Sequence, residues 1–177
     1  MSTRESSRAL LITGTVGAGK TSVADTVGDL LIGTEVPHAV IDLDWLRRSW
    51  PTPPGDRFNI EMELRNLRSV ARNYLDAGAL RLVLAGVVEN RDDRQRYRDA
   101  IGVDLTVCRL HVELPVVHQR LARRHAGEDA SLRWHLERSE RLDQILGNAQ
   151  IEDFVIEATD RSVTEVAAAV VKAAGWS

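Results

Sequence analysis

The chain has 177 residues, a formal net charge of -3 at pH 7 and an isoelectric point near 6.0. This length favours one domain spanning residues 1–177, and the acidic balance argues against a general attraction to nucleic acid or to an anionic membrane. The first eight residues are polar, and no apolar run approaches the ~20 residues of a membrane span, so we expect no membrane partner and a cytoplasmic location.

Short apolar runs alternate with helical patterns along the chain. The runs predict strands near residues 8–13, 38–42, 80–87, 105–112 and 153–157. Helices are predicted at 21–32, at 56–77 with Gly78 as a stop, from an N-cap at Ser131 to about Leu146, and from Ser162 or Thr164 onward. This alternation favours an α/β fold, with a parallel sheet covered by helices on both faces.

The most informative stretch lies between the first predicted strand and the first predicted helix. Residues 14–21 read Gly-Thr-Val-Gly-Ala-Gly-Lys-Thr and fit the phosphate-binding pattern G-x-x-x-x-G-K-[ST]. The glycines let consecutive backbone N–H groups turn inward around a phosphate, and the following helix directs its positive end at the same anion. The pattern predicts a nucleotide-phosphate site formed by Gly14, Thr15, Val16, Gly17, Ala18, Gly19, Lys20, Thr21 and Ser22.

Lysine usage supports this prediction. Lys20 and Lys172 are the only lysines among 23 basic residues, so a chain that otherwise uses arginine has a lysine where a compact ammonium suits a phosphate. We assign Lys20 to the β- and γ-phosphates of ATP, and the Thr21 hydroxyl to Mg²⁺.

Two aspartates follow the second predicted strand. Asp42 and Asp44 would emerge at the carboxyl edge of the sheet, where ligands of open parallel sheets bind. One carboxylate can orient the Mg²⁺ shell and the other can accept a proton from a substrate hydroxyl. We favour Asp42 for the metal and Asp44 for the base or acceptor ligand, although the residues alone leave open which aspartate is the base. Asp44 also suits the N-cap of a helix beginning near Trp45.

Arginines cluster after the fourth predicted strand, in a helix with Pro115 in its first turn. Arg120 and Arg124 are four residues apart and share a face, and Arg123 is three residues from Arg120. Arginines on a mobile segment can close over a nucleotide and neutralise charge during phosphoryl transfer. We therefore predict a small lid at about residues 120–133, with weaker candidates at Arg133, Arg138, Arg141 and His135.

Other residue types give weaker signals. Glu89 and Arg91 follow the third predicted strand and are possible substrate contacts. For Trp45, Trp50 and Trp134, packing in the core is the default expectation over lining a pocket. Cys108 is the only cysteine, and its apolar surroundings predict an inert buried thiol.

With these residues in hand, the chain resembles the small P-loop kinases of the nucleoside-monophosphate-kinase group, which include shikimate, gluconate and adenylylsulfate kinases and chloramphenicol phosphotransferase. The resemblance rests on the loop at 14–21, the Asp42-x-Asp44 pair, the lid arginines and the residues 159–167 after the last strand. It implies a three-layer P-loop NTPase fold with a five-stranded parallel sheet in the order 2-3-1-4-5. It also implies that one lid arginine stacks on the adenine and another approaches the transferring phosphate, with Arg161 in the loop near the adenine.

The leading hypothesis is an ATP- and Mg²⁺-dependent kinase that phosphorylates a hydroxyl of a small molecule. Lys20, Asp44, Arg120 and Arg124 would be its catalytic residues. The alternatives are a regulatory nucleotide-binding module without phosphotransfer and a 5′-hydroxyl kinase of nucleic acid, although no basic stripe supports the latter. The acceptor stays open among alcohols, sugar acids, antibiotics and nucleosides, because its pocket is formed by residues of about 45–75 and 86–95. The oligomeric state is also left open.

Overall fold

Five parallel strands form one sheet in the computed structural model, which describes residues 6–176. The strands are β1 (Arg8–Thr13), β2 (His38–Asp42), β3 (Arg81–Ala85), β4 (Asp104–His111) and β5 (Phe154–Glu157). Their order is β2-β3-β1-β4-β5, which confirms the predicted sheet. Residues 1–5 and 177 lie outside the described residues. All six belong to the predicted domain span, and residues 1–5 also belong to the polar segment at the start of the sequence.

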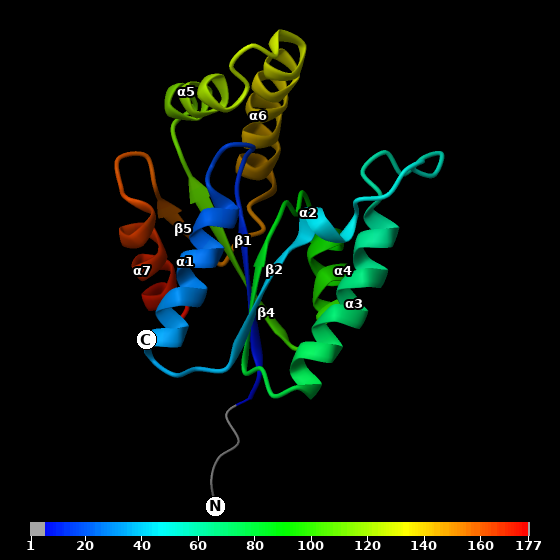
Figure 1. The fold of residues 1–177 in the computed structure, drawn as a ribbon, viewed down its shortest axis with the longest axis vertical. Coiled ribbons are helices and arrows are strands. Elements are labelled where there is room, and N and C mark those ends of the chain that lie inside the picture. The colour runs from blue at the N-terminus through cyan, green and yellow to red at the C-terminus, as the bar shows by residue number, and fades with distance from the viewer. Residues whose placement is uncertain (1–5, 177) are drawn as a thin grey trace, which may run out of the picture.

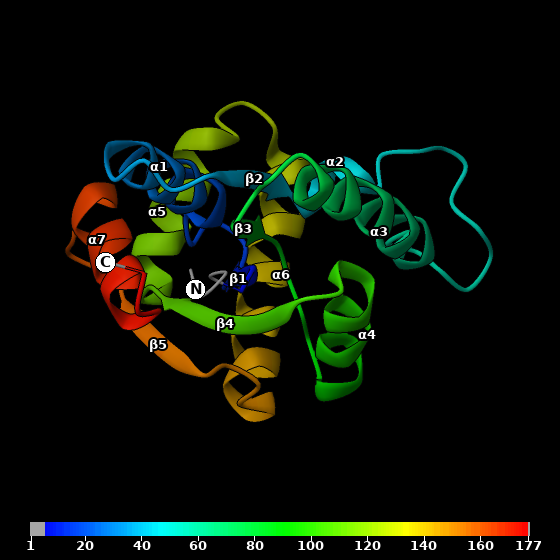
Figure 2. The same cartoon turned by 90° about the horizontal axis from the view of Figure 1, so that it is seen from below.

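Helices cover both faces of this sheet (Figures 1 and 2). The helices are α1 (Lys20–Gly33), α2 (Leu43–Leu46), α3 (Ile60–Asp76), α4 (Arg91–Ile101), α5 (Leu114–Arg124), α6 (Asp129–Ala149) and α7 (Val163–Ala173). Helices α1 and α7 cover one face, α3 and α4 cover the other, and α5 and the outer part of α6 rise beyond the carboxyl ends of the strands. Within residues 6–176, no helix combines the length and the apolar character that crossing a bilayer requires.

The central strand β1 explains why the sheet has two apolar faces. Leu10 and Ile12 belong to the core beside α1 and α7, whereas Ala9 and Leu11 belong to the core beside α3 and α4. Successive side chains of a strand point to opposite faces, so a strand covered on both sides is apolar at every position. This burial fixes β1 between β3 and β4 and places the loop after Thr13 at the middle of the carboxyl edge.

Some predicted helix starts are wrong by a few residues. Helix α3 begins at Ile60 rather than Asp56, because Asn59 has a left-handed backbone with φ 58°. The Asp56 carboxylate nevertheless accepts hydrogen bonds from the N–H groups of Ile60 and Glu61, at 2.8 and 3.1 Å. The last helix does begin after Ser162, which forms a complete capping box with Glu165.

The predicted N-cap at Ser131 is also wrong. Helix α6 begins at Asp129, two residues earlier, so Ser131 lies in its first turn. The Ser131 hydroxyl lies 3.2 Å from Nδ1 of His125 and therefore ties α6 to the end of α5. Only residues 125–128 connect the two helices, so the predicted lid at 120–133 corresponds to two helix ends and a short turn.

The contact between Gly86 and α2 yields a stability prediction. A Cβ atom at Gly86 would lie 2.5 Å from Cδ1 and 2.8 Å from Cβ of Leu43, the first residue of α2. We expect Gly86→Ala to lower the free energy of unfolding by about 1–3 kcal/mol, because it overpacks a buried contact. Urea unfolding measures the change. In the control variant Gly33→Ala, the new Cβ meets no atom within 4 Å, so a loss of similar size there would contradict the steric explanation.

Candidate active site

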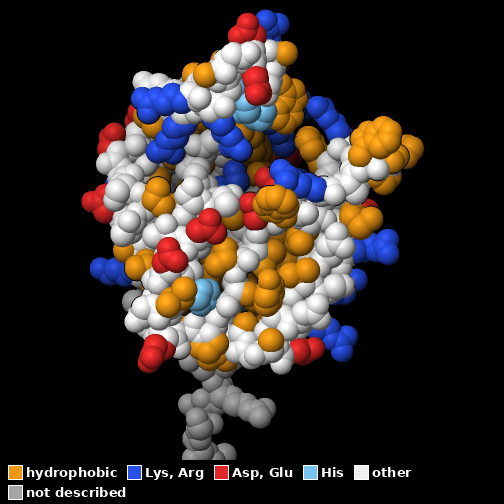
Figure 3. Space-filling view, viewed as in Figure 1, with side chains coloured by type: hydrophobic (Ala, Val, Ile, Leu, Met, Phe, Trp, Pro, Cys, Tyr) orange, Lys and Arg blue, Asp and Glu red, His pale blue; other side chains and the backbone are white. Residues whose placement is uncertain are grey.

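A cavity of about 1010 Å³ opens at the carboxyl edge of the sheet. Its walls come from the loop between β1 and α1, from α2 and the segment after it, from the start of α3, and from α5 and α6. Figure 3 shows the hollow beneath the outer ends of α5 and α6, with Lys and Arg side chains gathered on its edge. A parallel sheet is expected to bind ligands at this edge, and the loop at 14–21 lies there.

The phosphate loop connects β1 directly to α1. Gly17 and Gly19 have positive φ angles of 82° and 92°, which other residues rarely adopt, and Gly19 is the N-cap of α1. A Cβ atom at Gly17 would also lie 3.2 Å from Cγ of Leu121 on α5. The loop residues that line the cavity are Val16, Gly17, Gly19, Lys20, Thr21 and Ser22. The predicted residues Gly14, Thr15 and Ala18 instead lie beneath this surface.

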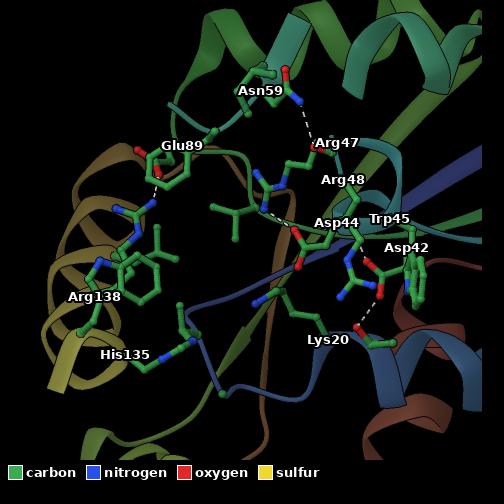
Figure 4. Close-up of a pocket in the computed structure, with 18 of the residues that line it drawn as sticks. Lys20, Asp42, Asp44, Trp45, Arg47, Arg48, Asn59, Glu89, His135 and Arg138 are labelled. Atoms are coloured by element: carbon green, nitrogen blue, oxygen red, sulfur yellow. Dashed lines mark hydrogen bonds and ion pairs between the residues drawn. The ribbon is translucent and has the colours of Figure 1, made fainter. Parts of the chain in front are cut away.

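Lys20 supplies the cation at the centre of the cavity (Figure 4). Its Nζ donates to the carbonyl oxygens of Gly14 and Thr15, at 3.1 and 3.0 Å. Desolvation lowers the pKa of Lys20 to about 8, opposed first by the negative charge of Asp44 and then by that of Asp42. Across residues 6–176 this ammonium has no ion-pair partner, so no carboxylate in contact with it cancels its charge.

Asp42 is fixed by two hydrogen bonds at the end of β2. Its Oδ2 accepts from the Thr21 hydroxyl at 3.2 Å, and its Oδ1 accepts from the N–H of Asp44 at 2.9 Å. Asp42 is therefore the N-cap of α2, and the expectation that Asp44 caps this helix is wrong. The helix begins at Leu43, two residues earlier than predicted, so the Asp44 side chain lies in the first turn and faces the cavity.

A buried chain of polar groups supports Asp44 from behind. Arg47 forms an ion pair with Asp44, and its Nε lies 3.5 Å from Oε2 of Glu63. Glu63 is 1% exposed and accepts a hydrogen bond from the Tyr97 hydroxyl. Burial raises the pKa of Glu63 to about 7, against the lowering effects of Tyr97 and Arg47. Asn59 donates to the Arg47 carbonyl at 3.0 Å, which fixes the backbone of the same segment.

The predicted lid arginines lie on α5 beside the phosphate loop. Arg120 and Arg124 both line the cavity, and Arg120 lies 3.4 Å from the carbonyl oxygens of Gly17 and Ala18. Arg123 is not among the lining residues. Arg161 is not among them either, because its guanidinium donates to the carbonyls of Glu157 and Glu165 in the loop after β5. A role of Arg161 at the adenine stays a prediction.

The far half of the cavity holds a different set of side chains. Glu89, which the sequence suggested as a substrate contact, forms an ion pair with Arg138 of α6, and both residues line the cavity. Arg91 does not reach this cavity and lines a separate surface pocket beside Arg94. Trp134 lines the cavity with 42% of its surface exposed, and Trp45 lines it beside Asp42 with 66% exposed (Figure 4). The expectation of core packing is wrong for both, and also for Trp50. Trp50 is 91% exposed and lies outside the lining.

Sequence reasoning missed several residues of this site, among them Arg47, Phe58, Glu63 and Tyr97. One signal was available for Glu63. It lies on the buried side of α3 with Leu64 and Leu67, and a carboxylate on an apolar stripe requires a buried partner. The partner Tyr97 lies on α4, 34 residues away, and no local pattern pairs the two helices.

The sheet order, the phosphate loop and the two helices above it define the fold of a P-loop kinase. The model of the adenylylsulphate kinase family matches residues 6–127, more than half of the chain, and the chain belongs to this family. It is thus an ATP-dependent phosphotransferase that acts on a hydroxyl of a small molecule. A search of curated protein sequences finds no significant match.

Solved structures share the fold along almost the whole chain. The APS kinase of Mycobacterium tuberculosis, in complex with AMPPNP and APS, is 22% identical with a TM-score of 0.65, covering 96% of this chain and 98% of that one. The tunicamycin resistance protein of Deinococcus radiodurans is 20% identical with a TM-score of 0.66, covering 97% of each chain. The shikimate kinase of Acinetobacter baumannii, in complex with shikimate, is 17% identical with a TM-score of 0.61, covering 96% and 93%.

The buried carboxyl of Glu63 gives a pH-dependent prediction. Because its pKa is raised to about 7 in the folded protein, the folded state binds a proton that the unfolded state releases between about pH 4.5 and pH 7. Stability from this group is therefore present at low pH and lost as the pH rises through this window. We expect Glu63→Gln to weaken the fall in unfolding free energy between pH 5 and pH 8, by an amount on the order of 1–3 kcal/mol.

Urea unfolding at several pH values measures this difference. Glu61→Gln is the matched control, because Glu61 lies on the same helix with an exposed side chain. Equal pH profiles for wild type and Glu63→Gln would contradict a raised pKa of Glu63.

Proposed function

We propose that Asp44 is the general base of this kinase, that Lys20, Arg120 and Arg124 hold the phosphates of ATP, and that Thr21 and Asp42 hold Mg²⁺. The observation that supports this assignment best is the shared cavity. Lys20 faces it from the start of α1 and Asp44 from α2, and of the nearby charges Asp44 has the largest effect on the pKa of Lys20. A phosphate donor bound by Lys20 and a hydroxyl acceptor bound by Asp44 would therefore lie in the same cavity.

The donor atoms around Thr21 fit magnesium. A hydroxyl and a carboxylate oxygen lie 3.2 Å apart at the start of α1, and both are hard ligands that Mg²⁺ prefers. Within residues 6–176 no group of three or more His, Cys, Asp or Glu side chains can hold a metal ion. Mg²⁺ in kinases needs only one or two protein ligands besides substrate phosphates, and when bound it neutralises charge on them.

The residues of the chain divide the reaction between them. Backbone N–H groups of the phosphate loop and the Lys20 ammonium hold the β- and γ-phosphates, and Arg120 and Arg124 stabilise the charge of the transition state. Asp44 accepts the proton of the acceptor hydroxyl as its oxygen bonds to the γ-phosphorus. The bond from that phosphorus to the ADP oxygen breaks, and ADP leaves with the electron pair. Because the reaction consumes ATP, we place the enzyme in the cytoplasm.

Removing the central ammonium tests the phosphate half. We expect Lys20→Ala to reduce acceptor-stimulated ADP release by about 100-fold or more, because the cation that offsets phosphate charge is lost. Lys172→Ala is the matched control, since Lys172 is the other lysine and lies exposed on α7. Full activity of Lys20→Ala would rule out the assigned phosphate site.

Neutralising the proposed base tests the chemical step separately from nucleotide binding. We expect Asp44→Asn to lower kcat by about 10²–10⁴-fold with little change in the Kd for AMPPNP, because the amide cannot accept the proton. The control variant Asp25→Asn removes an exposed carboxylate on α1 and should leave kcat unchanged. An unchanged kcat in Asp44→Asn would remove Asp44 from the role of base.

A further inference from the structure

The basic side chains of the cavity differ between its two halves. We call the part around Lys20 and α5 the phosphate half, and the part around Arg47, Glu89 and Arg138 the acceptor half. In the phosphate half, Lys20, Arg120 and Arg124 form no ion pair within residues 6–176. In the acceptor half, Arg47 and Arg138 each form an ion pair with a carboxylate of the site itself. The first arrangement leaves positive charge for a polyphosphate, whereas the second leaves little for the acceptor.

Arg47 is held between two carboxylates. It pairs with Asp44 on the cavity side and lies 3.5 Å from Glu63 on the protein side. An anionic acceptor would have to draw Arg47 toward the cavity, away from a carboxylate that has almost no access to water. Arg47 would have to give up its ion pair with Asp44 as well, and a displaced Arg47 leaves the buried Glu63 carboxyl either uncompensated or obliged to take up a proton. Both consequences cost free energy, so this arginine is a poor partner for an acceptor anion.

Arg138 is occupied in a similar way on the opposite wall. It pairs with Glu89, and its guanidinium lies 5.2 Å from the centre of the Phe58 ring. The other two arginines that line the cavity outside α5 and α6, Arg48 beside Asp42 and Arg57, are exposed and lie 4.1 and 5.4 Å from the rings of Trp45 and Phe58. Water and salt screen charges in such positions, so they add little affinity for an anion.

Aromatic rings supply the apolar surface of the acceptor half. Phe58 is 38% exposed and lines the cavity together with Trp134, whereas Trp45 lies beside Asp42 at the other end (Figure 4). The Trp134 ring packs edge-on against His135 at 4.8 Å, which limits its freedom to turn away. Exposed rings grouped around one cavity are typical of a site that binds a flat or apolar ligand.

We propose that the phosphate acceptor is an uncharged hydroxylated molecule that bears a flat ring system, bound against Phe58 and Trp134 with its hydroxyl directed at Asp44. The proposal rests on the phosphotransfer function above and adds the chemical class of the acceptor. This acceptor class differs from adenylylsulphate, the compound after which the family is named. Adenylylsulphate has a flat base but bears negative phosphate and sulphate groups. We expect the site to bind a ring as flat as that of adenylylsulphate, but not to bind the anionic groups of that compound.

Adenosine and adenylylsulphate form a matched pair of probes, because they share one ring system and differ in the anionic group. Calorimetric titration of the wild-type protein, saturated with AMPPNP and Mg²⁺ to fill the phosphate half, measures the Kd of each. Uridine and chloramphenicol serve as further uncharged probes, and shikimate as an anion without an aromatic ring. We expect at least one uncharged aromatic probe to bind with a Kd below about 1 mM, and adenylylsulphate to bind no more than about threefold tighter than adenosine.

Two variants test the residues behind this expectation. Phe58→Ala should weaken the bound uncharged probe by about fivefold or more, whereas Trp50→Ala, outside the cavity, should not change its Kd. Glu89→Gln releases Arg138 from its ion pair and should raise the affinity for adenylylsulphate severalfold relative to adenosine.

The proposal is overturned if adenylylsulphate binds about tenfold tighter than adenosine in the wild type, if shikimate binds tighter than every uncharged probe, or if no uncharged aromatic probe binds below about 1 mM. An unchanged Kd in Phe58→Ala overturns the ring platform, and an unchanged ratio in Glu89→Gln overturns the role of the ion pair. Failure of phosphotransfer is distinguishable: an acceptor that binds as expected yet yields no phosphorylated product contradicts the proposed function and not the binding preference.

Discussion

The site depends on a lysine ammonium that is kept near carboxylates but not paired with one. Lys20 is held by the carbonyls of Gly14 and Thr15, which fix its position without cancelling its charge. A carboxylate in contact with this ammonium would compete with phosphate for it. Both nearby aspartates are instead bound elsewhere, Asp42 to Thr21 and the start of α2, and Asp44 to Arg47. The polar network around the cavity therefore preserves the charge that the phosphate requires.

Arg47 is the link through which the protein interior controls Asp44. Its ion pair keeps Asp44 on the acceptor side, and its contact with Glu63 ties it to the body of the protein between α3 and α4. Glu63 is buried, so a displacement of Arg47 leaves a carboxylate without compensation unless it takes up a proton. With a pKa of about 7, Glu63 is able to do so near neutral pH. Arg47 thus connects the proposed base to a buried carboxyl whose pKa burial raises.

Local patterns in the sequence were sufficient for the sheet and for the phosphate loop. The strands of a buried parallel sheet are continuous apolar runs, and the loop is specified by consecutive residues, so all five strands and the cluster around Lys20 could be predicted. Helix starts were predicted less accurately where an aspartate side chain accepts hydrogen bonds from the first N–H groups of the helix. Asp56 does so for Ile60 in α3, and Asp42 does so for Asp44 in α2. In the acceptor half, Glu89 and Arg138 were named only as weaker candidates. Their pairing and that of Tyr97 with Glu63 could not be predicted, since these pairs join residues 49 and 34 positions apart.

Helix α6 contacts both halves of the cavity. Its inner part is anchored by buried Ser139, Leu142 and Leu146, and the Thr15 hydroxyl of the phosphate loop donates to the Ser139 carbonyl at 2.5 Å. One residue before that anchor, Arg138 reaches Glu89 across the acceptor half. Outward from this point the helix is less buried, and its residues face the cavity or solvent. The turn of α6 that accepts the hydrogen bond from the Thr15 hydroxyl therefore also places Arg138 against Glu89 and Phe58, so both parts of the cavity share one structural support.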